Sequence, residues 1–189
     1  MKRYKEGYGY INPRQTNSFL DTCAFDPKYA PEDQVAQAIL DLHDKGIVQL
    51  LLSHTNQKEI EHPNTPTHVK KRASEMIFTI EAPLNIDEVT QQARIHSVLT
   101  GNGNPEKYRA DATHVFEAGK YGGYFITTDN RILLKRDELA EFCEATILKP
   151  SEWLNIFDSW LCPIHHPSLR SVSSSTRLPV HPCSTARWP

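Results

Sequence analysis

The sequence has no long apolar run and few cysteines. None of its apolar stretches approaches the roughly 20 residues that a membrane-spanning helix needs, and no apolar segment follows the basic residues at the start, as it would in a signal peptide. The four cysteines form no Cys-x-x-Cys pair, so neither a zinc knuckle nor a redox motif is indicated. Cys23 and Cys143 are predicted to be small buried apolar side chains. We therefore expect a soluble, cytoplasmic protein with no membrane partner.

Asp, Glu and Lys are absent after Asp158. The last 31 residues contain seven serines and five prolines and show neither a helical nor a strand period, so they cannot bury enough apolar surface to offset the entropy lost on ordering. Cys162, His165 and His166 lie there without a fourth ligand at the usual spacing, which argues against zinc. We predict a leader over residues 1–17, one folded domain over residues 18–158 and a disordered tail over residues 159–189.

The predicted folded part is acidic. Residues 1–158 contain all 23 acidic residues and 18 of the 21 lysines and arginines, which gives a formal charge of −5. No overall field therefore attracts a nucleic acid. A protein of this composition would have to bind an anionic ligand through metal ions and local basic patches.

Strand-like and helix-like segments alternate along the predicted domain. Apolar and β-branched runs predict strands at residues 18–22, 47–52, 76–80, 124–128 and 146–148. Helical periods with proline starts or glycine stops predict helices at residues 31–46, 54–62, from residue 66, 87–99, 104–120, and 130–143 with a break near Asp137. This alternation predicts an α/β fold, a three-layer sandwich with a mostly parallel central sheet.

Four acidic residues are placed where such a fold could bring them together. Asp21 and Asp129 follow predicted strands, Glu59 lies on the short helix after the second strand, and Asp111 lies on the helix that leads into the Asp129 strand. Ligands of open parallel sheets gather at the carboxyl ends of the strands. Four clustered carboxylates require cations, and hard oxygen ligands suit Mg²⁺ or Mn²⁺. Such a site can activate water for attack on a phosphodiester.

These residues resemble those of the PIN-domain nucleases. Phe19-Leu20-Asp21-Thr22 is similar to the opening strand of the family with its first acid, and Lys58-Glu59-Ile60 to the helix with the second. Asp111-Ala112-Thr113-His114 and Phe125-Ile126-Thr127-Thr128-Asp129 resemble the third acid on its helix and the Ile-Thr-x-Asp strand end. The resemblance spans residues 18–157, and its weight comes from order and spacing.

The resemblance implies a Mg²⁺- or Mn²⁺-dependent endoribonuclease with an RNA substrate, in which Asp21, Glu59, Asp111 and Asp129 are the metal ligands and catalytic residues. Bacterial toxins of toxin–antitoxin pairs are a large branch of this family, so an antitoxin-like protein partner is compatible with the sequence, as is a homodimer. Two alternatives stay open. One is a DNA-cutting nuclease with the same site, because no residue is identified that reads a 2′-hydroxyl. The other is a catalytically silent PIN-like module that binds RNA or a protein.

Several of these residues also have a structural interpretation. Asp21 alone could form a turn and Asp129 alone could cap a helix. Glu61 competes with Glu59 as the second ligand, because residues two apart on a helix point to different faces. His114 lies near the face of Asp111, where it could contact a phosphate, although packing between helix and sheet is favoured.

The remaining candidates concern the substrate and the surroundings of Asp129. The hydroxyl of Thr127 or Thr128 could hold a metal-bound water or orient Asp129, but strand propensity explains a threonine equally well. The basic candidates for substrate contact are Arg131, Lys70, Lys71 and Arg72. Arg131 is favoured by its position, because charge runs are usually solvated faces.

Overall fold

One parallel sheet organises the protein. The computed structural model describes residues 10–25 and 27–161. Its sheet has the strand order β3-β2-β1-β4-β5, and every neighbouring pair is parallel. The strands are β1 (Asn17–Leu20), β2 (Gln49–Leu52), β3 (Ile77–Phe78), β4 (Tyr124–Ile126) and β5 (Thr146–Leu148). The predicted α/β sandwich is confirmed.

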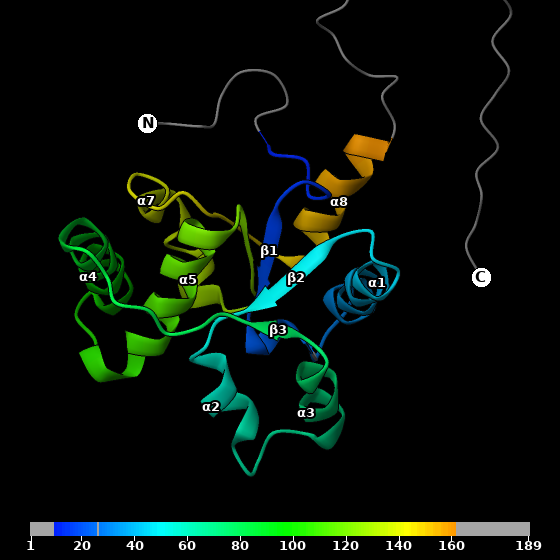
Figure 1. The fold of residues 1–189 in the computed structure, drawn as a ribbon, viewed down its shortest axis with the longest axis horizontal. Helices are drawn as coiled ribbons and strands as arrows, with labels where there is room; N and C mark the ends of the chain where they lie inside the picture. The colour runs from blue at the N-terminus through cyan, green and yellow to red at the C-terminus, as the bar shows by residue number, and fades with distance from the viewer. Residues whose placement is uncertain (1–9, 26, 162–189) are drawn as a thin grey trace, which may run out of the picture.

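Helices cover both faces of the sheet (Figure 1). Helices α1 (Glu32–Asp44) and α8 (Pro150–Leu161) pack against each other on one face. Helices α4 (Ile86–Thr100), α5 (Arg109–Tyr121) and α7 (Arg136–Leu139) lie on the other face. The shorter helices are α2 (Asn56–Glu61), α3 (Thr67–Ser74) and α6 (Asn130–Leu133), with the 3₁₀ helices η1 (Thr22–Ala24) and η2 (Pro105–Tyr108).

The strands supply alternate residues to two separate cores. In β1, Leu20 packs into the core beneath α1 and α8, whereas its neighbour Phe19 packs into the core beneath α4 and α5. In β4, Tyr124 and Ile126 join the first core and Phe125 joins the second. Successive side chains of a strand point to opposite faces, so a sheet covered on both sides needs continuous apolar strands. The uninterrupted apolar runs in the sequence therefore follow from the three layers.

The helix α8 was not among the predicted elements, although its signals are present. Pro150 occupies the first helical position, Glu152 lies in the first turn, and Trp153 and Phe157 are buried one turn apart. The indole Nε1 of Trp153 donates a hydrogen bond of 3.0 Å to Ser18 Oγ in β1. The predicted domain boundary at Asp158 falls inside this helix.

The other predicted elements are present with shifted ends. The single helix expected over residues 104–120 is two, η2 and α5, and the helical segment after Asp129 consists of α6 and α7. Residues 1–9 of the predicted leader and residues 162–189 of the predicted tail, including Cys162, His165 and His166, lie outside the described residues. Within the described part, no helix has the length and apolar character to cross a membrane.

The chain reverses its direction across the sheet next to β1. It runs from β1 outward to β2 and β3, then returns to form β4 on the opposite side of β1. The carboxyl ends of β1 and β4 therefore form a topological switch point, where open α/β sheets bind ligands. Asp21 follows β1 at this point, and its backbone N–H donates to the carbonyl of Ile126 at the end of β4 over 2.9 Å.

Candidate metal centre

Asp21 is held in one orientation by hydrogen bonds to both carboxylate oxygens. It is the N-cap residue of η1, and Oδ1 accepts from the backbone N–H of Thr22 at 2.8 Å. Oδ2 accepts from the hydroxyl of Thr127 at 2.6 Å. Thr127 is fully buried, and its Oγ1 also accepts from the backbone N–H of Asp129 at 3.0 Å. Thr127, the first residue after β4, thus positions both Asp21 and Asp129.

Glu59 reaches the same place from α2. Its Oε2 accepts a hydrogen bond of 2.7 Å from Thr22 Oγ1, and Thr22 Oγ1 accepts one of 2.9 Å from Asn56 Nδ2. Asn56 is buried one turn before Glu59. Glu61 is exposed and its carboxylate accepts instead from Gln57. Of the two glutamates, Glu59 is therefore the one next to Asp21.

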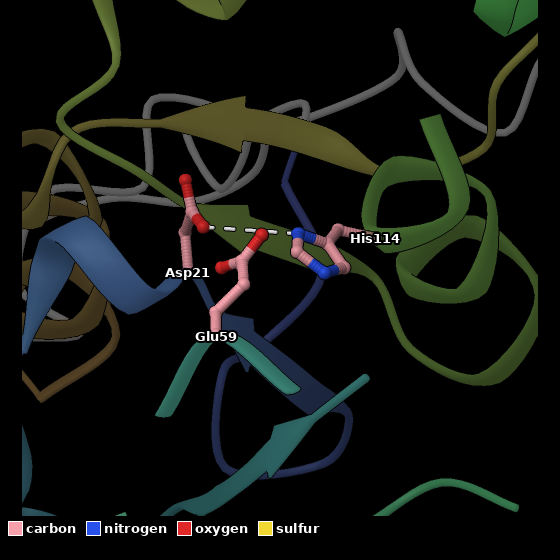
Figure 2. A group of neighbouring side chains, drawn as sticks. All are labelled: Asp21, Glu59 and His114. Atoms are coloured by element: carbon pink, nitrogen blue, oxygen red, sulfur yellow. Dashed lines mark ion pairs between the residues drawn. The ribbon is translucent and has the colours of Figure 1, made fainter. Parts of the chain in front are cut away.

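His114 completes a group of three potential ligands (Figure 2). Asp21, Glu59 and His114 each offer one ligand atom, and these atoms lie within 4.8 Å of one another. An ion with bonds of about 2.1 Å holds opposite ligands about 4 Å apart, so the spacing is of the right order for one ion. Two carboxylates and one imidazole are also donors that divalent metals accept. The group can therefore hold a metal ion.

Asp111 and Asp129 lie beside this group, and both carboxylates interact with the guanidinium of Arg131. The guanidinium of Arg131 donates to both carboxylate oxygens of Asp129. Its single Nε lies 3.0 Å from each oxygen, and Nη2 also donates to Oδ2. The same guanidinium lies 3.7 Å from Asp111 Oδ2 and over the ring of Tyr108. Asp129 also caps α6, because its Oδ1 accepts from the backbone N–H of Arg131 at 2.8 Å. Asp129 is therefore a helix cap, and its carboxylate pairs with Arg131 outside the group formed by Asp21, Glu59 and His114.

The carboxyl groups of Asp111 and Asp129 differ in their pKa values. Burial, together with the negative charge of Asp21, raises the pKa of Asp111 to about 6, and the positive charge of Arg131 compensates for this only in part. Burial acts in the same direction on Asp129, but hydrogen bonds from Arg131 outweigh it and hold the pKa of Asp129 below its usual range. Repulsion among the clustered acids is therefore expressed mainly as a raised pKa of Asp111.

This repulsion predicts a pH-dependent stability for the metal-free protein. With a folded-state pKa of about 6 against an ordinary value of 3.8, the folded state binds more protons than the unfolded state between these pH values. Stability should therefore fall as pH rises from about 4 to about 6. The Asp111→Asn variant lacks this loss, so at pH 7.5 in EDTA we expect it to be more stable by roughly 2 kcal/mol, or about 5 °C in melting temperature.

Melting curves at pH 4.5 and pH 7.5 measure the effect. The variant should exceed the wild type at pH 7.5 and match it at the lower pH. Asp137→Asn, at an exposed position of α7, is the control for removing a negative charge elsewhere. Equal pH dependence in all three proteins would contradict the repulsion at Asp111.

The other predicted candidates lie outside the group of three ligands. Thr128 Oγ1 donates to the backbone carbonyl of Cys23 at 3.1 Å, so the hydroxyl that bonds to Asp21 is that of Thr127. Arg72 bonds to Asp44 at 2.5 Å and to the carbonyl of Leu40, which fixes α3 to α1. Lys70 and Lys71 lie on α3 as well, Lys71 on its exposed side.

A hollow beside Glu59 presents a different set of basic groups. It has a volume of about 550 Å³, and its lining includes Thr22, Glu59, Pro66 and Val69. Its basic lining residues are Lys28, Lys58 and His62. None of these was a candidate in the sequence, because they are separated along the chain and form no charge run. Each of them is nevertheless close in sequence to one of the acids: Lys28 follows Asp21, and Lys58 and His62 flank Glu59.

Cys23 departs from the prediction that it is a buried apolar side chain. The residue is exposed, whereas Cys143 is buried as predicted. The thiol of Cys23 donates to Asp21 Oδ2 at 3.2 Å and lies 3.4 Å from Thr127 Oγ1. The reason is the turn of η1, which directs Cys23 back toward the acid two residues before it.

A second buried network connects α5 to the loop that leads into α2. Glu117, one turn after His114, contacts His54 Nδ1 at 2.6 Å and accepts from the hydroxyl of Thr79 at 2.5 Å. The backbone N–H of His54 donates to the same hydroxyl at 2.8 Å. These contacts fix the helix that carries His114 relative to the segment that carries Glu59.

Comparisons with known proteins give no match to this chain among protein-family models, curated proteins or solved structures. The chemistry of the centre therefore rests on its own residues and their geometry.

Proposed function

We propose that this protein is a metal-dependent endoribonuclease of the PIN-like type. The observation that carries the proposal is the position of the Asp21, Glu59 and His114 group at the switch point between β1 and β4, next to a hollow whose lining includes three basic residues. A divalent ion held by this group, Mg²⁺ or Mn²⁺, would offset the charge of a phosphodiester and activate water for its hydrolysis.

The residues around the group have distinct roles in this proposal. Thr127 and the backbone of Thr22 hold Asp21 in a fixed orientation, so little reorganisation is needed when a substrate binds. Arg131 places a positive charge between Asp111 and Asp129, where an anionic phosphate would otherwise be repelled.

The hollow supports a polyanionic substrate. Lys28, Lys58 and His62 line it beside Glu59, so they offer the local basic contacts that an acidic nuclease needs for a phosphate backbone. The resemblance of the four acidic segments to PIN-domain nucleases supports RNA as the substrate. A DNA-cutting nuclease would use the same residues, and a silent binding module would keep the hollow but not the reaction.

Cleavage of a mixed oligonucleotide set tests the proposal. We expect single-stranded or hairpin RNA to be cut in Mg²⁺ or Mn²⁺ and to stay intact in EDTA, while DNA of the same sequence stays intact. Cleavage of DNA alone would replace RNA by DNA as the substrate. Retention of RNA in a gel shift without cleavage in any metal would refute the nuclease and favour the binding module.

A further inference from the structure

His114 has an environment that packing alone does not explain. Its side chain is almost completely buried on α5, at 1% exposure, yet Nε2 has no hydrogen-bond partner among the described residues. A buried polar atom without a partner costs roughly 1–3 kcal/mol, so an apolar side chain would serve packing better. The other ring nitrogen, Nδ1, points toward the two carboxylates and lies 3.8 Å from Asp21 Oδ1 (Figure 2).

The neighbours of Nδ1 indicate which tautomer is present. One neighbour of Nδ1 is Asn56 Nδ2, at 3.5 Å, and an amide nitrogen can only donate. The same Asn56 nitrogen donates to Thr22 Oγ1, which donates in turn to Glu59. Nδ1 therefore presents a lone pair toward Asp21 and Glu59. A lone pair facing two carboxylates is repulsive unless a cation lies between them.

We propose that His114 binds the metal ion directly through Nδ1, and that the resulting nitrogen–oxygen donor set selects a transition-metal ion such as Mn²⁺ over Mg²⁺. This deepens the proposed function, since it concerns the same centre. Mg²⁺ favours sites made of oxygen donors only, whereas first-row transition ions accept imidazole together with carboxylates. His114 is then a ligand rather than a residue that only fills space between α5 and the sheet.

Two substitutions at His114 separate these roles. His114→Leu removes the nitrogen donor but keeps the volume. His114→Gln replaces the nitrogen by an amide oxygen, which Mg²⁺ accepts as readily as Mn²⁺ does. His96→Gln is the matched control, because His96 lies on α4 and bonds to the carbonyl of Pro105, away from the centre.

The experiment titrates the full chain with Mn²⁺ and with Mg²⁺ by calorimetry and records the electron paramagnetic resonance spectrum of bound Mn²⁺. We expect the wild type and His96→Gln to bind Mn²⁺ at least about tenfold more tightly than Mg²⁺ and to show coupling to a ¹⁴N nucleus. In His114→Leu, Mn²⁺ affinity should fall by about 10- to 100-fold and the nitrogen coupling should vanish. In His114→Gln, the preference for Mn²⁺ should shrink while Mg²⁺ binding persists.

Unchanged Mn²⁺ preference in His114→Gln, or nitrogen coupling that survives in either variant, would overturn the proposal. If His114→Leu does not fold, the His114→Gln spectrum decides. Failure of this inference and failure of the nuclease proposal give different results. Nitrogen coupling without cleavage of any oligonucleotide would support His114 as a ligand and refute the nuclease. Metal-dependent RNA cleavage with unchanged Mn²⁺ binding in both variants would support the nuclease and refute His114 as a ligand.

Discussion

Asp21→Asn is expected to abolish cleavage while the protein stays folded. Asparagine keeps the shape of the side chain but removes the charge, so a metal loses one anionic ligand and its affinity should fall by at least about 100-fold. The buried environment of Asp21 tolerates the change, because the amide can still accept from the backbone N–H of Thr22 and can donate to Thr127. Removal of this charge also relieves the repulsion felt by Asp111.

Thermal melting with and without Mn²⁺ distinguishes a ligand from a structural residue. The wild type should gain stability with Mn²⁺, because an ion that binds only the folded state stabilises it. Asp21→Asn should melt at the same temperature as the metal-free wild type, or above it, and should show no gain. A purely structural Asp21 would give lower stability in the variant and no metal-induced shift in the wild type. Cleavage of RNA by the variant at the wild-type rate would be equally incompatible with the proposed role.

Glu59→Gln and Glu61→Gln form the second comparison with a large expected difference. Glu59 bonds to Thr22 beside Asp21, whereas Glu61 is exposed and bonds to Gln57. We expect Glu59→Gln to lower Mn²⁺ affinity by about 10- to 100-fold and to reduce RNA cleavage at least as much. Glu61→Gln removes the same charge from the same helix, so it controls for long-range electrostatics and should change affinity less than about twofold.

Calorimetric titration of both variants with Mn²⁺ measures this difference, and cleavage rates at saturating Mn²⁺ separate binding from chemistry. Equal losses in the two variants would mean that α2 contributes only a general negative field. A larger loss in Glu61→Gln would assign the ligand role to the other glutamate.

The fold could be predicted because its pattern is repeated in the chain. Runs such as residues 50–52 are apolar throughout, which is typical of a strand covered on both faces, and the helices between the strands have proline starts and glycine stops. Element ends were less accurate, because they depend on tertiary contacts. The helix α8 has a signal in the sequence, since Trp153 and Phe157 have helical spacing behind Pro150, but the change of composition at Asp158 falls within the same helix.

The centre could be predicted only in part. Asp21 and Asp129 follow strands, and strand ends meet at one edge of a parallel sheet, so their proximity has a local signal. The approach of His114 to Asp21 has none, because it depends on how α5 lies across the sheet. For the same reason the sequence favours packing for His114 and does not reveal the hollow beside Glu59.

The central position of β1 has a consequence for how the protein acquires its centre. Ser18 pairs with Leu50 on one side and with Tyr124 on the other, and its hydroxyl accepts from Trp153. Contacts between residues so distant in sequence give a high contact order, and the entropy of closing these loops is lost before the contacts form. Asp21 is oriented through Thr127, so the ribosome must release the chain through β4 before this acid takes its position. The nascent protein remains without its centre until β4 has been synthesised.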